Sequence, residues 1–152
     1  MRYIFLAVIA IWAPLGSAFD RQPSPELTPI SVVEIVLAAM AENDKPTPDA
    51  GIAQAFQFAS PQNKASTGPF WHFAAIVKHP NYAPLLNHRS RELGEPVVQG
   101  NSATIPIVVV SSTGEVAGFM WRLSKQPAGD FADSWMTDAV ERIPLGHSIK
   151  SL

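Results

Sequence analysis

The sequence predicts an α+β fold in which N-terminal helices pack on a curved antiparallel sheet. Apolar residues recur at helical spacing up to about His88, and from Ser90 onward they alternate with polar residues as in strands. Short turns containing glycine separate the alternating segments, as in hairpins. Because helices come first and strands follow, the layout is that of an α+β domain. The chain of 152 residues has room for one such domain, expected over residues 31–142.

The first eighteen residues have the layout of a signal peptide. Arg2 gives a positive end, Tyr3 to Ala13 is an apolar run, and Gly16 and Ala18 are the small residues of a cleavage site. We therefore expect residues 1–18 to be removed after Ala18 and the protein to be exported, to the periplasm or the medium. The alternative is an uncleaved anchor, but eleven apolar residues are fewer than the ~20 that a spanning helix needs. No stable membrane insertion is expected after cleavage.

The helical half begins after a proline-rich leader, residues 19–30, which is expected to order little. Ser31 and Glu34 form an S-x-x-E capping box, so the first helix is predicted to begin there. Its buried stripe is formed by Val33, Val36, Leu37 and Met40.

Three further helical segments are predicted before the strands. They are a helix over about 49–59, a turn of helix capped by Ser60 and running through Lys64, and a helix from Gly68-Pro69 to about His79. Asn81 to His88 is expected to add one more helical turn around Pro84. Strands are expected over 90–99, 102–112, 116–125 and 131–140, and residues 143–152 are predicted to be a loose tail.

Composition excludes several functions. The chain has no cysteine, which rules out a thiol nucleophile or a cysteine-ligated metal. With 11 basic and 13 acidic residues, a nucleic-acid partner is not expected. His72 and His79 lie ~10.5 Å apart along a helix, too far to share a metal. The sequence contains no G-x-S-x-G, G-x-G-x-x-G or P-loop motif, so neither a metal site nor a cofactor is predicted.

A polar cluster and several aromatic residues are the candidates for a site. His88 with Arg89 or Arg91 could hold an anionic substrate, with His88 as general acid or base. The alternative is a helix-to-strand corner whose side chains cap backbone groups and face water.

Two strand tryptophans form the second candidate. Trp121 and Trp135 could line a pocket with Asp138 at its rim, or both rings could simply be core. In a regular strand, Trp135 and Asp138 point to opposite faces, which a bulge would change.

Several stretches, in this order and spacing, resemble a family of small bacterial and plant-type proteins classed as a domain of unknown function. They are Pro48–Ile52, Phe56–Pro61 with Asn63-Lys64, Thr67–Pro69, Tyr82–Arg89, Trp121–Gln126 and Trp135–Asp138. The family resembles the cone-shaped, nuclear-transport-factor-2-like (cystatin-like) superfamily, which implies helices inside a strongly bent sheet. The resemblance implies no activity. Ala139 and Ser134 stand where the family pattern has glycine and often cysteine.

Three functions remain open. The first is a non-catalytic module that binds a small molecule in the cone, at residues drawn from Trp71, Tyr82, His88, Arg89, Trp121, Trp135 and Asp138. The second is a small-molecule enzyme with His88 or Asp138 as acid or base, an inference from fold analogy alone. The third is a homodimer or partner-docking module that uses the outer face of the sheet.

Overall fold

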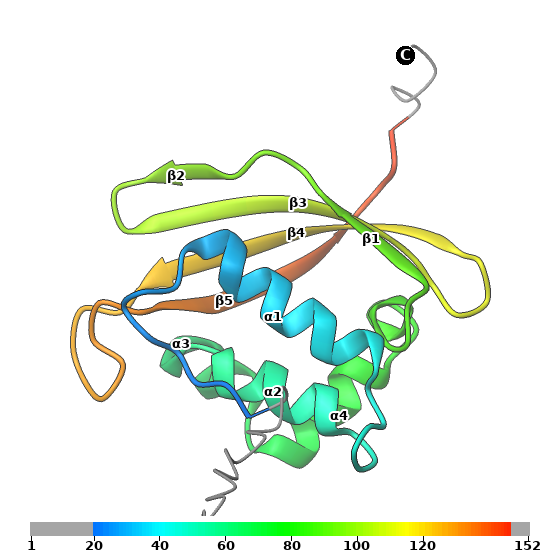
Figure 1. The fold of residues 1–152 in the computed structure, drawn as a ribbon, viewed down its shortest axis with the longest axis horizontal. Helices are drawn as coiled ribbons and strands as arrows, with labels where there is room; N and C mark the ends of the chain where they lie inside the picture. Colours follow the sequence, from blue (N-terminus) through cyan, green and yellow to red (C-terminus); the bar gives the residue numbers. More distant parts are fainter. Residues whose placement is uncertain (1–19, 147–152) are drawn as a thin grey trace, which may run out of the picture.

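The structure is a computed structural model that describes residues 20–146. The predicted signal peptide and the last six residues of the predicted tail lie outside this range. The described elements, in chain order, are α1 (Pro29–Ala41), α2 (Ala50–Phe58), α3 (Pro61–Thr67), α4 (Phe70–Lys78), a 3₁₀ turn η1 (Ala83–Leu85), β1 (Ser90–Leu93), β2 (Val97–Gln99), β3 (Ser102–Val110), β4 (Val116–Lys125) and β5 (Trp135–Ile143) (Figure 1).

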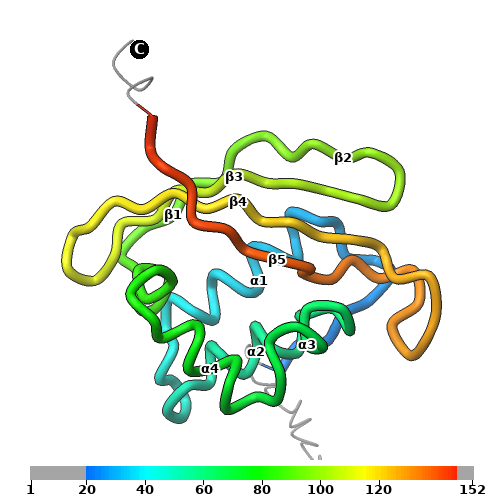
Figure 2. The backbone as a smooth tube through the Cα atoms, turned by 180° about the vertical axis from the view of Figure 1, so that it is seen from behind, coloured from blue at the N-terminus to red at the C-terminus, as the bar shows by residue number. Residues whose placement is uncertain are grey.

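The predicted α+β fold is confirmed. All strand pairs are antiparallel, in the order β1-β3-β4-β5, with β2 also pairing with β3. The helices lie together on one face of this sheet, with α1 against the strands and α2, α3 and α4 beyond it (Figures 1 and 2). We call the face toward the helices the inner face. Among the described residues, no helix is long and apolar enough to cross a membrane.

The core lies between α1 and the inner face. The alternation predicted for the strands is confirmed, since one side chain in two along β3 and β4 is buried. These inner-face residues are Ala103, Ile105, Ile107, Val109, Ala117, Phe119, Trp121 and Leu123. On α1, the predicted stripe of Val33, Val36, Leu37 and Met40 is buried against them. Burial of this apolar surface is the main force that holds helices and sheet together.

The prediction that Ser31 caps the first helix is wrong. The N-cap is Thr28, whose hydroxyl accepts a hydrogen bond from the backbone N–H of Ser31 at 3.2 Å. Pro29 follows at the first helical position, where its missing N–H is not needed. α1 therefore begins two residues earlier, inside the predicted leader. Ser60 caps α3 as predicted, by accepting from Asn63 N–H, but this helix continues beyond Lys64 to Thr67.

Three predicted strands have different bounds in the structure, and the one expected over 102–112 ends two residues earlier, at Val110. The segment 90–99 divides into β1 and β2, both paired with β3. Between them Gly94 lies against Pro106, where a Cβ would come within 2.7 Å of the proline ring, and Pro106 has no N–H for the ladder. The last strand begins at Trp135, because residues 131–134 form a turn in which Asp133 has a φ of 62°. It continues to Ile143, into the predicted tail.

Candidate functional site: a cavity between the helices and the sheet

A cavity of about 390 Å³ lies between the helices and the inner face of the sheet. Its wall takes residues from all four α-helices, η1, β4 and β5. Most of the wall is apolar, and its larger apolar side chains include Val36, Met40, Phe73, Ile76, Val77 and Trp121. Phe73, Ile76 and Val77 follow i, i+3, i+4 spacing, which places them on one face of α4. A small, mostly apolar cavity of this size is typical of a ligand site.

A β-bulge in β5 shapes the sheet side of the cavity. Leu123 pairs with Thr137 while its neighbour Arg122 pairs with Ala139, so Asp138 is an extra residue with no partner on β4. A bulge of this kind redirects the side chains around it. Asp138 is part of the cavity wall, together with Thr137 on one side and Ala139 on the other.

The neutral polar groups beside Asp138 are hydrogen-bonded to one another. The indole Nε1 of Trp121 donates to Thr137 Oγ1 at 2.9 Å. The carbonyl oxygen of Thr137 accepts from Ser60 N–H at 2.8 Å and from Asn63 Nδ2 at 3.1 Å. These bonds tie the start of α3 to the edge strand β5.

The carboxylate of Asp138 differs from these groups. Its Oδ1 atom is enclosed and has no hydrogen-bond partner among the described residues. In the part of the chain that the structure describes, no lysine, arginine or histidine lines the cavity. A buried oxygen without a donor costs free energy, so Oδ1 is an unmet acceptor of a residue that lines the cavity.

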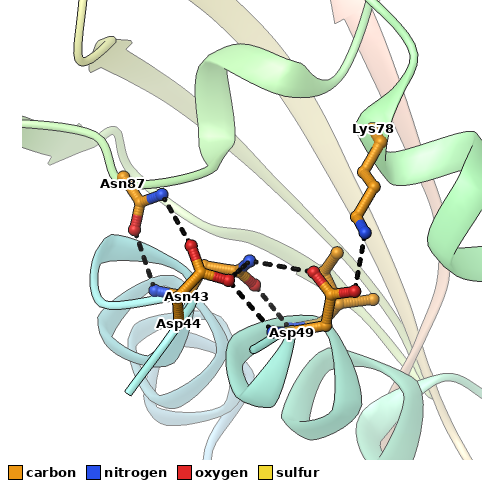
Figure 3. A network of polar contacts seen from close by, with 6 residues as sticks. Asn43, Asp44, Asp49, Lys78 and Asn87 are labelled. Atoms are coloured by element: carbon orange, nitrogen blue, oxygen red, sulfur yellow. Dashed lines mark hydrogen bonds and ion pairs between the residues drawn. The ribbon is translucent and has the colours of Figure 1, made fainter. Parts of the chain in front are cut away.

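A polar network holds the C-terminal ends of α1 and α4 and the segment after η1 (Figure 3). Asn43, just after α1, is buried; its Oδ1 accepts from Ile52 N–H, and its backbone N–H donates to Asn87 Oδ1, both at 3.0 Å. Asp49 accepts from Lys78 Nζ at 2.6 Å and from Asn43 Nδ2 at 3.3 Å. Asp44 completes the network by accepting from Asp49 N–H at 3.0 Å.

Residues close in sequence to this network line the cavity. Met40, Val77 and Leu85 line the cavity, and each lies within three residues of a network member. The Met40 carbonyl also accepts from Asn87 N–H at 2.8 Å. Hydrogen bonds within the network, led by the one from Asp49 N–H, lower the pKa of Asp44 below its ordinary value of 3.8.

The structure brings three of the predicted site residues to the cavity: Tyr82, Trp121 and Asp138. Tyr82 stacks on Phe119, with ring centroids 6.4 Å apart. Trp135 is buried outside the cavity wall, with Lys125 Nζ 5.5 Å from its ring centroid. Trp71 lies on the surface of α4 with 72% of its area exposed.

His88 and Arg89 also lie outside the cavity wall. His88 is buried at the corner between η1 and β1, and its Nδ1 lies 2.7 Å from the Leu85 carbonyl oxygen. Nδ1 is therefore the protonated nitrogen, and Nε2 has no partner among the described residues. Burial lowers the pKa of His88, and Arg91 adds to this, while the Leu85 carbonyl and Glu34 oppose it. Arg89 is exposed. His88 thus contacts a backbone carbonyl and Arg89 faces water, as in the structural alternative, but His88 itself is buried.

Sequence reasoning missed most of the wall. Asn63 and Thr67 of α3 line the cavity, as does Met40 of α1. Asn63 had one usable signal, because it lies three residues after a Ser-Pro helix start and is buried although polar. Nothing in the local sequence indicates that it reaches across to Thr137.

Residues 25–144 match the family described as Domain of unknown function (DUF4864). No curated protein and no solved structure matches the chain significantly.

Proposed function

The chain belongs to the DUF4864 family, whose description names no activity, and we propose that it is an exported, non-catalytic domain that binds a small molecule. The observation that carries the proposal is the apolar cavity between helices and sheet, with one carboxylate at its wall. Export rests on the signal-peptide pattern of residues 1–18.

The architecture supports this use of the cavity. The helices cover only the inner face of the antiparallel sheet, and the cavity lies between them and the strands β4 and β5. We propose on this basis that the fold is of the cone-shaped, nuclear-transport-factor-2-like kind. In such a layout, a ligand lies between rigid elements, which lowers the entropic cost of binding.

Native mass spectrometry tests the proposal. The mature protein is recovered from the envelope fraction of its own host, and its mass is compared with the mass of the chain beginning at Phe19. We expect a second species heavier by one small molecule that is lost on collisional activation. A protein that carries no small molecule, even after exposure to a host metabolite extract, would contradict the proposal.

A pair of variants links such a molecule to the cavity. Ile76→Trp enlarges a half-buried side chain of the cavity wall and should abolish the heavier species. Ala75→Trp adds the same side chain at the neighbouring position, which is exposed and outside the wall. This variant should keep the heavier species. Equal retention by both variants would place the ligand elsewhere.

A second candidate function is self-association through the outer face of the sheet. Val97 of β2 and Val116 of β4 are more than half exposed, and Val108 and Met120 between them are half-buried. Contiguous apolar surface of this kind is typical of a docking site. Light scattering on the wild type and on Val116→Lys tests it, since a dimer formed there should dissociate in the variant.

A further inference from the structure

We infer that the ligand of the cavity is a small amine that is positively charged at neutral pH. Its nitrogen contacts the Asp138 carboxylate, and its apolar body fills the rest of the cavity. This inference rests on the proposed binding function and names its ligand class. It follows from the charge of the cavity wall, from the hydrogen bonds already made there, and from the available volume.

The charge of the wall favours a cation. Among the described residues that line the cavity, Asp138 is the only acidic one and none is basic. Neighbouring cations are engaged elsewhere: Lys64 Nζ lies 4.9 Å from the Phe56 ring centroid, and Arg142 pairs with Glu115 Oε1 at 2.6 Å. Asp138 forms no ion pair with any described residue. A carboxylate in apolar surroundings interacts strongly with a charge of opposite sign.

The hydrogen bonds at the wall favour a ligand that donates. Thr67 Oγ1 donates to the Asn63 carbonyl at 3.0 Å, and Ser66 Oγ donates to the Gln62 carbonyl at 3.2 Å, both within α3. The indole of Trp121 is occupied by Thr137. Among the described residues, none donates a hydrogen bond to the Asp138 carboxylate, so a ligand that carries a donor can supply one. An ammonium group supplies up to three.

The volume limits the apolar body. If each water-sized group occupies about 30 Å³, a cavity of 390 Å³ has room for about thirteen such groups. This suits a single ring with a short aminoalkyl chain. Phe73, Val77 and Trp121 offer the ring an apolar surface.

Three probes of matched shape test the inference: 2-phenylethylamine, 2-phenylethanol and phenylacetate. They are titrated at pH 7 into the ¹⁵N-labelled mature protein, and the indole N–H signals report their binding. A probe in the cavity should shift the signal of Trp121 and leave that of the exposed Trp71 unchanged. We expect the amine to bind at least tenfold more tightly than the alcohol, because a charge-assisted hydrogen bond is stronger than a neutral one.

Asp138→Asn keeps the shape of the side chain and removes its charge. It should weaken amine binding about tenfold and leave alcohol binding within about threefold. Glu141→Gln is the matched control, since Glu141 is an exposed carboxylate on the same strand, paired with Arg122 at 3.1 Å. This variant should bind all three probes as the wild type does.

The outcomes separate the two proposals. If the alcohol or the carboxylate binds as tightly as the amine, the amine assignment is overturned while the binding function stands. The same holds if Asp138→Asn binds the amine as the wild type does. If none of the probes shifts the Trp121 signal, the amine assignment is overturned, and the binding function is decided separately by the native mass spectrometry described above.

Discussion

The indole Nε1 of Trp121 and the hydroxyl of Thr137 form a buried hydrogen bond of 2.9 Å between β4 and β5. Thr137 immediately precedes the bulged residue Asp138, so the bond fixes both the tryptophan ring and the start of the bulge. Each partner is almost fully buried. The cavity wall on the sheet side therefore depends on one pair of side chains.

Replacing Thr137 with valine should destabilise the fold. The shape is kept, but the buried indole N–H loses its acceptor, which costs about 1–3 kcal/mol. Urea unfolding followed by fluorescence measures the loss in unfolding free energy. Thr104→Val, on the outer face and without a side-chain hydrogen bond among the described residues, is the control and should cost less than about 0.5 kcal/mol. Equal costs for the two variants would show that the bond contributes nothing.

The helical half could be predicted because its signals are local. Ser60-Pro61 combines a side-chain cap with a residue that has no N–H. In the structure, Ser60 caps α3 and Pro61 is its first residue, as predicted. The same logic misplaced the start of α1, because Thr28-Pro29 and Ser31 offer competing caps three residues apart. The pair that contains proline is the one used, since its φ is already helical.

The sequence predicts a pocket and three residues of its wall, but the rest of the wall could not be predicted, because it depends on pairing between distant segments. The bulge at Asp138 appears only when β5 is aligned with β4, and alternation within β5 does not reveal it. Trp71, Trp121 and Trp135 are chemically equivalent in the sequence, yet one is exposed, one lines the cavity and one is core. Tertiary packing makes this distinction.

Protonation of His88 should destabilise the protein in mildly acidic solution. Burial places its folded pKa below the ordinary 6.5, so the unfolded chain binds the proton more readily than the folded one. The contribution of His88 is therefore intact above about pH 6.5 and is lost progressively as the pH falls below it.

Thermal unfolding between about pH 7.5 and pH 5 tests this. His88→Asn, which retains a donor for the Leu85 carbonyl but does not titrate, should show a flatter stability profile than the wild type. His79→Asn removes an exposed imidazole and should follow the wild-type profile. A wild-type profile that is flat over this range would contradict the prediction.

Asp44 should contribute a separate loss of stability at lower pH. Its folded pKa lies below 3.8, because Asp49 N–H, with Asn87 and Asn43, donates to the charged form. The stabilisation is present above about pH 3.8 and disappears as the pH falls through the folded pKa. Asp44→Asn should therefore lower stability at neutral pH and flatten the profile between about pH 4 and pH 2. Asp130→Asn, in an exposed turn, serves as the charge control.

Gly51→Ala should destabilise the contact between α1 and α2. Within a helix alanine is normally favoured over glycine by about 1 kcal/mol. Here, however, a Cβ would collide with the carbonyl oxygen of Ala39 and lie 2.9 Å from the Cα of Asn43. The helices would have to move apart, at a cost of about 1–3 kcal/mol. Gly146→Ala, where a Cβ meets nothing within 4 Å, is the control in denaturant unfolding. A more stable Gly51→Ala protein would show that the two helices yield easily.

Gln54→Leu should release the segment before α1. The leader was expected to order little, but Gln54, almost fully buried on α2, holds both backbone groups of Arg21. Its Oε1 accepts from Arg21 N–H at 2.9 Å, and its Nε2 donates to the Arg21 carbonyl at 2.6 Å. Loss of two hydrogen bonds of about 1 kcal/mol each raises the population of the open segment on the order of tenfold or more.

Trypsin measures this opening directly, because it cleaves after Arg21. Under native conditions, we expect the Gln54→Leu protein to be cut there on the order of ten times faster than the wild type. Gln57→Leu changes another glutamine of α2, one without a hydrogen bond to the leader, and should be cut at the wild-type rate. If all three proteins are cleaved equally fast, the Gln54 bonds do not hold the leader in solution. If Gln57→Leu were cut as fast as Gln54→Leu, the opening would follow from any change in α2 and not from loss of the Gln54 bonds.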